Sequence, residues 1–140
     1  MSKSMHAPVS TKQAQHHHKA RQRWLLVLIY ASAIFAASAL PSDSLPSLSV
    51  SDKLVHAVEF GILAFLLCRA LRTHLPGRSR YFIMVISVLA TIAYGASDEA
   101  HQWFVAGRTT DLADLAADSL GACLAAWGWV KAGTHWTWLY

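Results

Sequence analysis

The sequence predicts an all-α fold, an integral membrane four-helix bundle with both termini cytoplasmic. Composition is the first reason, because 54% of the 140 residues are hydrophobic and 14% are charged, whereas about 25% of residues are charged in soluble domains. The second reason is a series of four long apolar runs without strand-like alternation. The third is the uneven placement of lysine and arginine along the chain. This composition excludes a disordered chain and disfavours a water-soluble domain.

The first predicted span covers residues 24–40, an uncharged run that can cross a hydrocarbon core of about 30 Å with help from its flanks. Residues 1–23 form a basic polar cytoplasmic tail. Its three consecutive histidines, residues 16–18, are interpreted as solvated, because a flexible segment gives them no fixed metal geometry. Residues 37–39 are similar to a signal-peptidase site, but the basic region ahead is long for a secretory signal, so we expect the span to be retained.

Three further apolar runs follow, over residues 54–71, 81–96 and 112–130. The run over 81–96 is shorter than the roughly 20 residues that a span requires, so we expect its helix to continue into the following SDEAHQWF sequence. The four spans form a membrane domain over residues 24–131. Residues 132–140 form a short aromatic cytoplasmic tail.

Small residues and cysteines inside these runs bear on how the helices pack. Ala117, Gly121 and Ala125 recur at four-residue steps, a spacing that lets helix backbones approach closely. Cys68 and Cys123 both lie within apolar runs, which excludes a disulfide scaffold and a CxxC metal site.

Basic residues set the predicted orientation. Ten of the twelve lysines and arginines fall on one side of the four spans, and only Lys53 and Arg108 fall on the other. Because cytoplasmic segments carry the excess of basic residues, both termini are predicted to be cytoplasmic. We therefore expect a multi-pass protein of the bacterial cytoplasmic (inner) membrane, with membrane lipids as its immediate partners.

The acidic residues gather on the opposite side. With this orientation all eight fall in the outer half of the protein. Glu59 and Asp118 lie at depths where an ionisable side chain costs a few kcal/mol, so a default placement of acids in outer loops does not explain them. The eight are Asp43, Asp52, Glu59, Asp98, Glu99, Asp111, Asp114 and Asp118.

Helical spacing places most of these acids on common faces with other polar residues. The three sets are Asp52, His56 and Glu59 at i, i+4 and i+7, Asp98, His101 and Gln102 at i, i+3 and i+4, and Asp111, Asp114 and Asp118 at i, i+3 and i+7. We expect these faces to meet at one outer level of the bundle, since burying them together costs less than exposing them to lipid. Asp111 is also placed to cap the last helix.

Several motifs follow one another along residues 34–130. They are Ile34-Phe35 with Ser38, Asp52-Lys-x-x-His-x-x-Glu59, Asp98-Glu-x-His-Gln102, the Gly107-Arg108 turn, and Asp114 with Gly121. In this order they resemble the VanZ-like family of small bacterial membrane proteins. The departures from the family pattern are Phe60 in place of a frequent Tyr, Ala106 in place of a Pro, and Asp118 in place of the usual Asn.

The resemblance implies a membrane protein that, like the namesake of the family, is linked to resistance to the glycopeptide antibiotic teicoplanin. We expect the polar cluster on the outer side to bind or modify an envelope component. The binding residues expected are Asp52, Lys53, Gln102, Arg108, Asp111, Asp114 and Asp118. In this interpretation Lys53 and Arg108 hold an anionic headgroup.

The alternative is a membrane-embedded enzyme that acts on a lipid-linked headgroup by acid/base chemistry. Its catalytic candidates are His56, Glu59, Asp98, Glu99 and His101, whose pKa values would be separated by burial and like-charge crowding. The sequence offers no obvious nucleophile for such an enzyme.

Other interpretations of the same residues are weaker. A metal site built from His56, Glu59, Asp98 and His101 lacks the second His/Glu pair of bundle metal sites, so we expect no metal and no cofactor. A purely structural network would have Glu59 hydrogen-bonded to His101 or to the Arg108 turn. An ion path is disfavoured because the acids stop at the outer half. We expect a lipid-linked envelope component or a surface protein as the further partner, and no nucleic acid.

Overall fold

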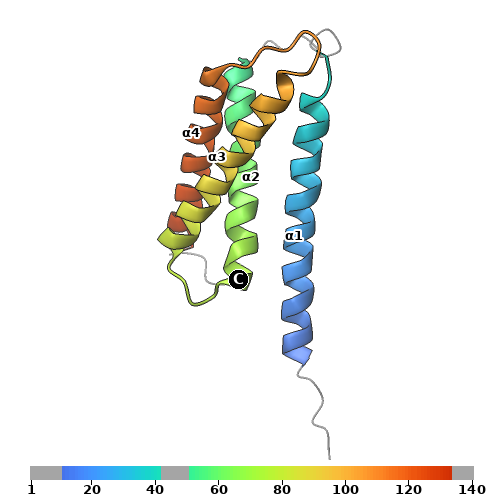
Figure 1. The fold of residues 1–140 in the computed structure, drawn as a ribbon. Helices are drawn as coiled ribbons and strands as arrows, with labels where there is room; N and C mark the ends of the chain where they lie inside the picture. Colours follow the sequence, from blue (N-terminus) through green and yellow to red (C-terminus); the bar gives the residue numbers. More distant parts are fainter. Residues whose placement is uncertain (1–10, 42–50, 134–140) are drawn as a thin grey trace, which may run out of the picture.

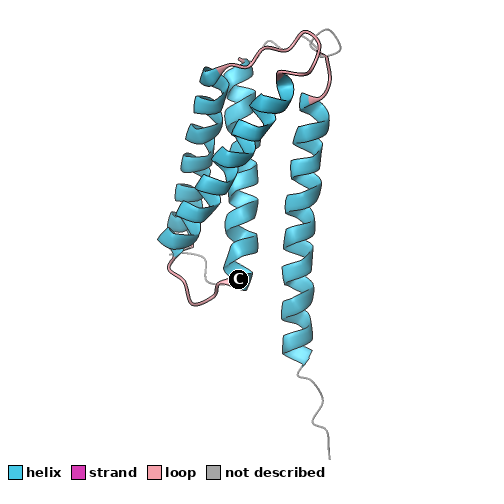
Figure 2. Cartoon of the chain, viewed as in Figure 1, coloured by secondary structure: helices cyan, strands magenta, loops and turns pink. Residues whose placement is uncertain are grey.

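The computed structural model describes residues 11–41 and 51–133, and every regular element in them is an α-helix. The helices are α1 (Thr11–Ser38), α2 (Asp52–His74), α3 (Arg80–Gln102) and α4 (Leu112–Ala132) (Figure 1). Figure 2 shows helices joined by loops, with no strand in the described residues. The prediction of four helices is therefore confirmed, including the continuation of the third helix through the SDEAHQ residues.

Local signals define where the later helices begin. The Ser79 hydroxyl accepts a hydrogen bond from the Phe82 backbone N–H at 3.1 Å, which caps α3. The Asp111 carboxylate accepts one from the Ala113 backbone N–H at 2.8 Å and caps α4, as its position in the sequence predicts. Asp114 adds an acid to the first turn of α4, where the helix dipole favours a negative charge.

The first helix is longer than the predicted span. It begins at Thr11, so residues 11–23, expected to be a polar tail, form its basic N-terminal half. At about 1.5 Å per residue its 28 residues exceed the length of the other three helices, and its N-terminal half projects beyond them (Figure 1). The predicted tail over 132–140 lies almost wholly outside the described residues.

The helices do not form a symmetrical bundle. Helix α2 is central and contacts the other three, and its most extensive interface is with α4. Helix α1 packs along α2 and touches α3 only slightly, and within the described residues it makes no contact with α4. Three helices thus form a compact group, with α1 lying against one side of it (Figure 1).

Glycines allow the close contact between α2 and α4. A Cβ placed on Gly121 would collide with the backbone carbonyl of Ala57, and one placed on Gly61 would lie 3.1 Å from the carbonyl oxygen of Gly121. The Ala117, Gly121 and Ala125 spacing predicts such an approach, and Gly121 confirms it. The two backbones are therefore nearly in contact just below the level of the polar residues.

The outer surface of the helices is strongly apolar. Leu28, Leu89 and Leu124 on three different helices are 61%, 58% and 64% exposed. Helices α2 and α3 are long and apolar enough to cross a membrane. Helices α1 and α4, also predicted as spans, do not reach the mean hydropathy that α2 and α3 have over the length of a span. The reason is that α1 ends at Ser38 soon after its arginines, and α4 carries Asp114, Asp118 and Lys131.

Charge separates along the long axis of the molecule. The N-terminal half of α1, the turn between α2 and α3 and the C-terminal end of α4 lie at one end (Figure 1). This basic end carries Arg72, Arg78 and Lys131. Lys53 at the start of α2 and Arg108 in the α3–α4 loop lie at the other end, together with the acids.

Candidate functional site

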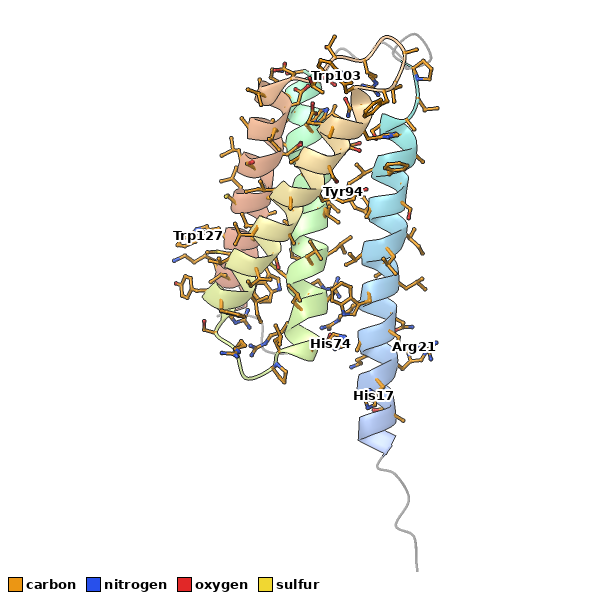
Figure 3. All side chains as sticks on the ribbon, viewed as in Figure 1. His17, Arg21, His74, Tyr94, Trp103 and Trp127 are labelled. Carbon is orange, nitrogen blue, oxygen red and sulfur yellow. The ribbon has the colours of Figure 1, made fainter. Side chains whose placement is uncertain are left out.

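Polar side chains from all four helices meet at the end of the molecule where α1 and α3 finish and α2 and α4 begin. Figure 3 shows this end marked by Trp103, far from His17, Arg21 and His74 at the basic end. We call it the polar end. Its members are Ser38, Asp52, Lys53, His56, Asp98, Glu99, His101, Gln102, Arg108, Asp111, Asp114 and Asp118.

One part of the polar end lies between α1 and α3. The Ser38 hydroxyl donates to Asp98 Oδ1 at 2.6 Å, and the Gln102 amide donates to Asp98 Oδ2 at 3.1 Å. All three side chains are buried, so Asp98 has both oxygens satisfied in an apolar setting. His101 stacks on Phe35 of α1 with its ring 4.4 Å away. This part joins α1 to the compact group of helices.

The other part lies between α2 and α4. Lys53 Nζ donates to Asp111 Oδ2 and to Asp114 Oδ1, both at 2.9 Å. One turn deeper, His56 Nδ1 lies 3.1 Å from Oδ1 of Asp118, which is almost completely buried. Each of these contacts joins residues of α2 to the start or first turns of α4, so hydrogen-bonded side chains hold the two helices in register above their glycine contact.

Glu99 connects the end of α3 to the start of α4. Its Oε2 accepts a hydrogen bond from the Asp111 backbone N–H at 3.0 Å. Asp111 thus meets three partners: Glu99 through its N–H, Ala113 and Lys53 through its carboxylate. The hydrogen bond from Lys53 holds the pKa of the Asp111 carboxyl below its ordinary value, with the cap to Ala113 acting in the same direction.

The loop between α3 and α4 turns at Gly107 and Arg108. Gly107 has φ of 75°, a conformation that favours glycine. The Arg108 guanidinium donates from Nε to the backbone carbonyl of Leu40 at 3.2 Å, which ties the loop to the end of α1. The predicted anion-holding pair is therefore engaged within the protein, since Lys53 meets two carboxylates and Arg108 meets a carbonyl.

Some buried polar atoms at the polar end have no hydrogen-bond partner among the described residues. They are Glu99 Oε1, His101 Nε2 and Asp118 Oδ2. Leaving a buried polar atom unsatisfied costs about 1–3 kcal/mol, so such atoms call for a specific reason. These three atoms remain without a described partner at the polar end, and Thr91 Oγ1 in the middle of α3 is a further such atom.

The structure brings most of the predicted site residues to one end of the molecule, but it separates them into two parts. The three polar faces do reach one level, yet the α1–α3 and α2–α4 parts form separate sets of contacts. Glu59, half-buried on α2, makes no hydrogen bond to any described residue, so the predicted bonds to His101 and to the Arg108 turn are not formed.

Two residues of the site were not predicted. Ser38 belongs to the motifs that resemble the family, but it was not expected to be a partner of Asp98. Gly95 on α3 provides space for Asp118, because a Cβ there would lie 3.0 Å from Asp118 Oδ2. An isolated glycine within a helix is the only trace that the sequence gives of this contact.

The possible metal ligands also differ from the prediction. Among the described residues, the one group that places three ligand atoms within 4.8 Å of one another is Asp52, His56 and Asp114. Of the four residues considered from sequence, only His56 belongs to it. Glu59 is not part of this group, and both carboxylate oxygens of Asp98 are hydrogen-bonded to Ser38 and Gln102.

Comparison with protein families decides the relationship. The model of the family described as VanZ/LLP1 matches residues 3–133, nearly the whole chain. The chain belongs to the VanZ/LLP1 family. Comparisons with curated proteins and with solved structures give no significant match. The resemblance seen in the sequence motifs is therefore confirmed at the level of the family, which is typically associated with membranes.

The motifs that resemble the VanZ/LLP1 family can now be located in the structure. Asp52-Lys-x-x-His and Asp114 contribute to the α2–α4 part of the polar end, and Asp98 and Gln102 to the α1–α3 part. The Gly107-Arg108 turn joins both parts through the α3–α4 loop. Most of the polar motif residues thus lie at the polar end, whereas Glu59 and Gly121 lie further along α2 and α4.

Proposed function

We propose that this VanZ/LLP1 protein is a multi-pass protein of the cytoplasmic membrane whose polar end faces the outside of the cell and binds an envelope component. The basic end then faces the cytoplasm, an orientation that the distribution of lysine and arginine supports. The apolar surface of the helices faces lipid, which accounts for the many exposed leucines.

The observation that carries this proposal is the incomplete pairing of the buried polar groups. A network that served only to hold helices together would be stable when nearly every member is satisfied. Here Asp98 is fully paired, whereas Glu99 and Asp118 each keep one buried carboxylate oxygen without a described partner. These oxygens are acceptors that a ligand with hydroxyl or amine donors can satisfy.

Membership of the VanZ/LLP1 family suggests the context of this binding, which is resistance to glycopeptide antibiotics. In the proposed orientation the polar end lies on the outer side of the membrane, where an envelope component is accessible. A protein that binds or masks a lipid-linked envelope component there reduces the access of teicoplanin to its target. Membrane lipids and that component are the proposed partners.

One contact favours an enzyme as the second candidate. The carboxylate of Asp118 orients the His56 ring through Nδ1 and leaves Nε2 available, which is the arrangement of a general base held by an acid. In this case the headgroup would be modified at the outer surface as well as bound.

Replacement of Glu99 by Gln tests the proposed function. The amide keeps the shape of the side chain and still accepts from the Asp111 N–H, but it loses the charge and the proton-transfer capacity. In a Gram-positive host, the wild-type protein is expected to lower susceptibility to teicoplanin. Glu99→Gln is expected to return susceptibility to that of the empty vector for an enzyme, and part of the way for a binding site.

The matched control is Ser97→Ala, an exposed position on the same helix whose hydroxyl bonds, among the described residues, to the Tyr94 carbonyl alone. It should protect as well as the wild type at equal abundance in the membrane. The proposal fails if Glu99→Gln, Asp98→Asn and Glu59→Gln all protect like the wild type. Absence of protection by the wild type itself would reject the link to teicoplanin.

A further inference from the structure

Asp52, His56 and Asp114 lie together at the polar end, and we propose that they bind a divalent transition-metal ion, with zinc the best match. Each of the three places one ligand atom within 4.8 Å of the others. Asp52 and His56 project from the same face of α2 one turn apart, and Asp114 comes from the first turn of α4. The site therefore forms only when α2 and α4 pack together.

The state of His56 is the second observation that points to a metal. The residue is 8% exposed, and Asp118 Oδ1 lies 3.1 Å from its Nδ1. In the neutral imidazole, a carboxylate at Nδ1 holds the proton on that nitrogen and leaves the lone pair on Nε2, for which the described residues offer no partner. A histidine held in this way by a carboxylate is the usual form of a metal-binding histidine.

The two aspartates also have carboxylate oxygens that make no hydrogen bond to the described residues. Asp114 is 7% exposed and gives Oδ1 to Lys53, which leaves Oδ2 without a partner among the described residues. Asp52 is exposed and makes no hydrogen bond there. Lys53 is hydrogen-bonded to Asp114, and Asp118 is hydrogen-bonded to His56. Two of the three proposed ligands therefore have supporting hydrogen bonds of the kind that orient metal ligands.

Charge favours a cation at this position. Lys53 faces the carboxylates of Asp111 and Asp114, while Asp52 and Asp118 are two further acids close to His56. The acids exceed the basic side chains, so an anionic headgroup would be repelled unless a metal ion lay between them.

The donor set selects the type of ion. One imidazole with two carboxylates suits zinc better than magnesium or calcium, which prefer oxygen ligands only. Three protein ligands leave a fourth position open to water or to a ligand oxygen, as in zinc sites that act on ligands. In a tetrahedral zinc site the ligand atoms lie about 3.4 Å apart, and Asp52, exposed at the end of its helix, is the side chain that can rotate to complete the site.

The test measures zinc bound to the purified full-length protein in detergent. Residues His16, His17 and His18 are replaced by alanine throughout, and a tag without histidine is used, because consecutive histidines bind zinc themselves. After equilibration with zinc and removal of the excess, elemental analysis is expected to find one zinc ion per chain.

Asp52→Asn is the decisive variant. It removes a proposed ligand without removing any hydrogen bond or ion pair of the described residues, so the helical circular dichroism should be unchanged while bound zinc is lost. Asp111→Asn is the matched control. It removes an acid that also meets Lys53 but is not a proposed ligand, and it should retain zinc. Asp118→Asn should lower zinc affinity by roughly 10–100-fold through His56.

The proposal is overturned if the protein with His16–His18 replaced binds no zinc, or if Asp52→Asn and Asp111→Asn retain equal amounts of it. This inference goes beyond the proposed function, and its readout is metal content rather than drug susceptibility. A negative result here therefore leaves the binding of an envelope component standing, and a failed susceptibility test leaves the zinc result standing.

Discussion

Replacement of His56 by alanine is expected to lower the free energy of unfolding by about 3 kcal/mol. His56 is the one described partner of Asp118, whose side chain is 1% exposed. The other oxygen of Asp118 already lacks a partner. Removing the imidazole would therefore leave a buried carboxylate with no hydrogen bond, next to Gly95 of α3, where a Cβ would lie 3.0 Å from Asp118 Oδ2.

Adding Asp118→Asn to His56→Ala identifies the buried charge as the cause. The double variant should recover part of the lost stability, because an uncharged amide costs less to bury than a carboxylate. Asp118→Asn alone should cost little, since its amide oxygen can still accept from His56 Nδ1. Thermal unfolding of the purified variants, followed by circular dichroism, measures these differences. Equal destabilisation of the double and the single variant would show that the loss comes from the space left by His56 and not from the charge.

Gly121→Ala is expected to lower stability by about 2 kcal/mol, an effect of overpacking. The added methyl group would collide with the Ala57 backbone on α2, and backbone atoms cannot rotate away as side chains do. The helices would have to separate at their closest point. The contacts of Lys53 and His56 with α4 lie just above it and would lengthen as well.

Gly128→Ala provides the matched control for Gly121→Ala. The same chemical change is made on the same helix two turns later, where a Cβ meets no atom within 4 Å. The alanine should be neutral or slightly stabilising because it is the better helix former. Comparison of the melting temperatures of the two variants tests the close approach of α2 and α4. A loss of stability in Gly128→Ala equal to that in Gly121→Ala would contradict it.

The sequence predicts the helices well because each is encoded locally. The apolar runs locate all four, and the position of Asp111 predicts a cap that the structure contains. The start of α1 was not predicted, because the polar residues from Thr11 onward have no apolar face to indicate a helix. The length of that helix follows from good helix-forming residues ahead of Trp24 and not from a pattern of burial.

The candidate site could be predicted only in part. Spacing along one helix shows that Asp52 and His56 share a face, and that Asp114 and Asp118 share another. It does not show which faces touch, and so the pairing of His56 with Asp118 was not predicted.

The roles of the two outer cations required the structure. Lys53 was predicted to bind an anionic headgroup, but packing of α2 on α4 brings it to two aspartates that lie 58 and 61 residues away in the sequence. Arg108 reaches the Leu40 carbonyl, 68 residues away. Such distant contacts depend on how the helices pack, which the motifs of a single chain do not encode.

The position of the polar end outside the cell is the central claim, and cysteine labelling tests it most directly. One variant carries Ala106→Cys in the exposed α3–α4 loop, and the other carries Gly77→Cys in the exposed turn between α2 and α3. Both contain Cys123→Ala, because Cys123 is exposed and Cys68 is buried. With a membrane-impermeant maleimide on intact cells of a Gram-positive host, Ala106→Cys should be labelled at once and Gly77→Cys only after the membrane is opened. Labelling of Gly77→Cys in intact cells, with Ala106→Cys protected, would contradict the account.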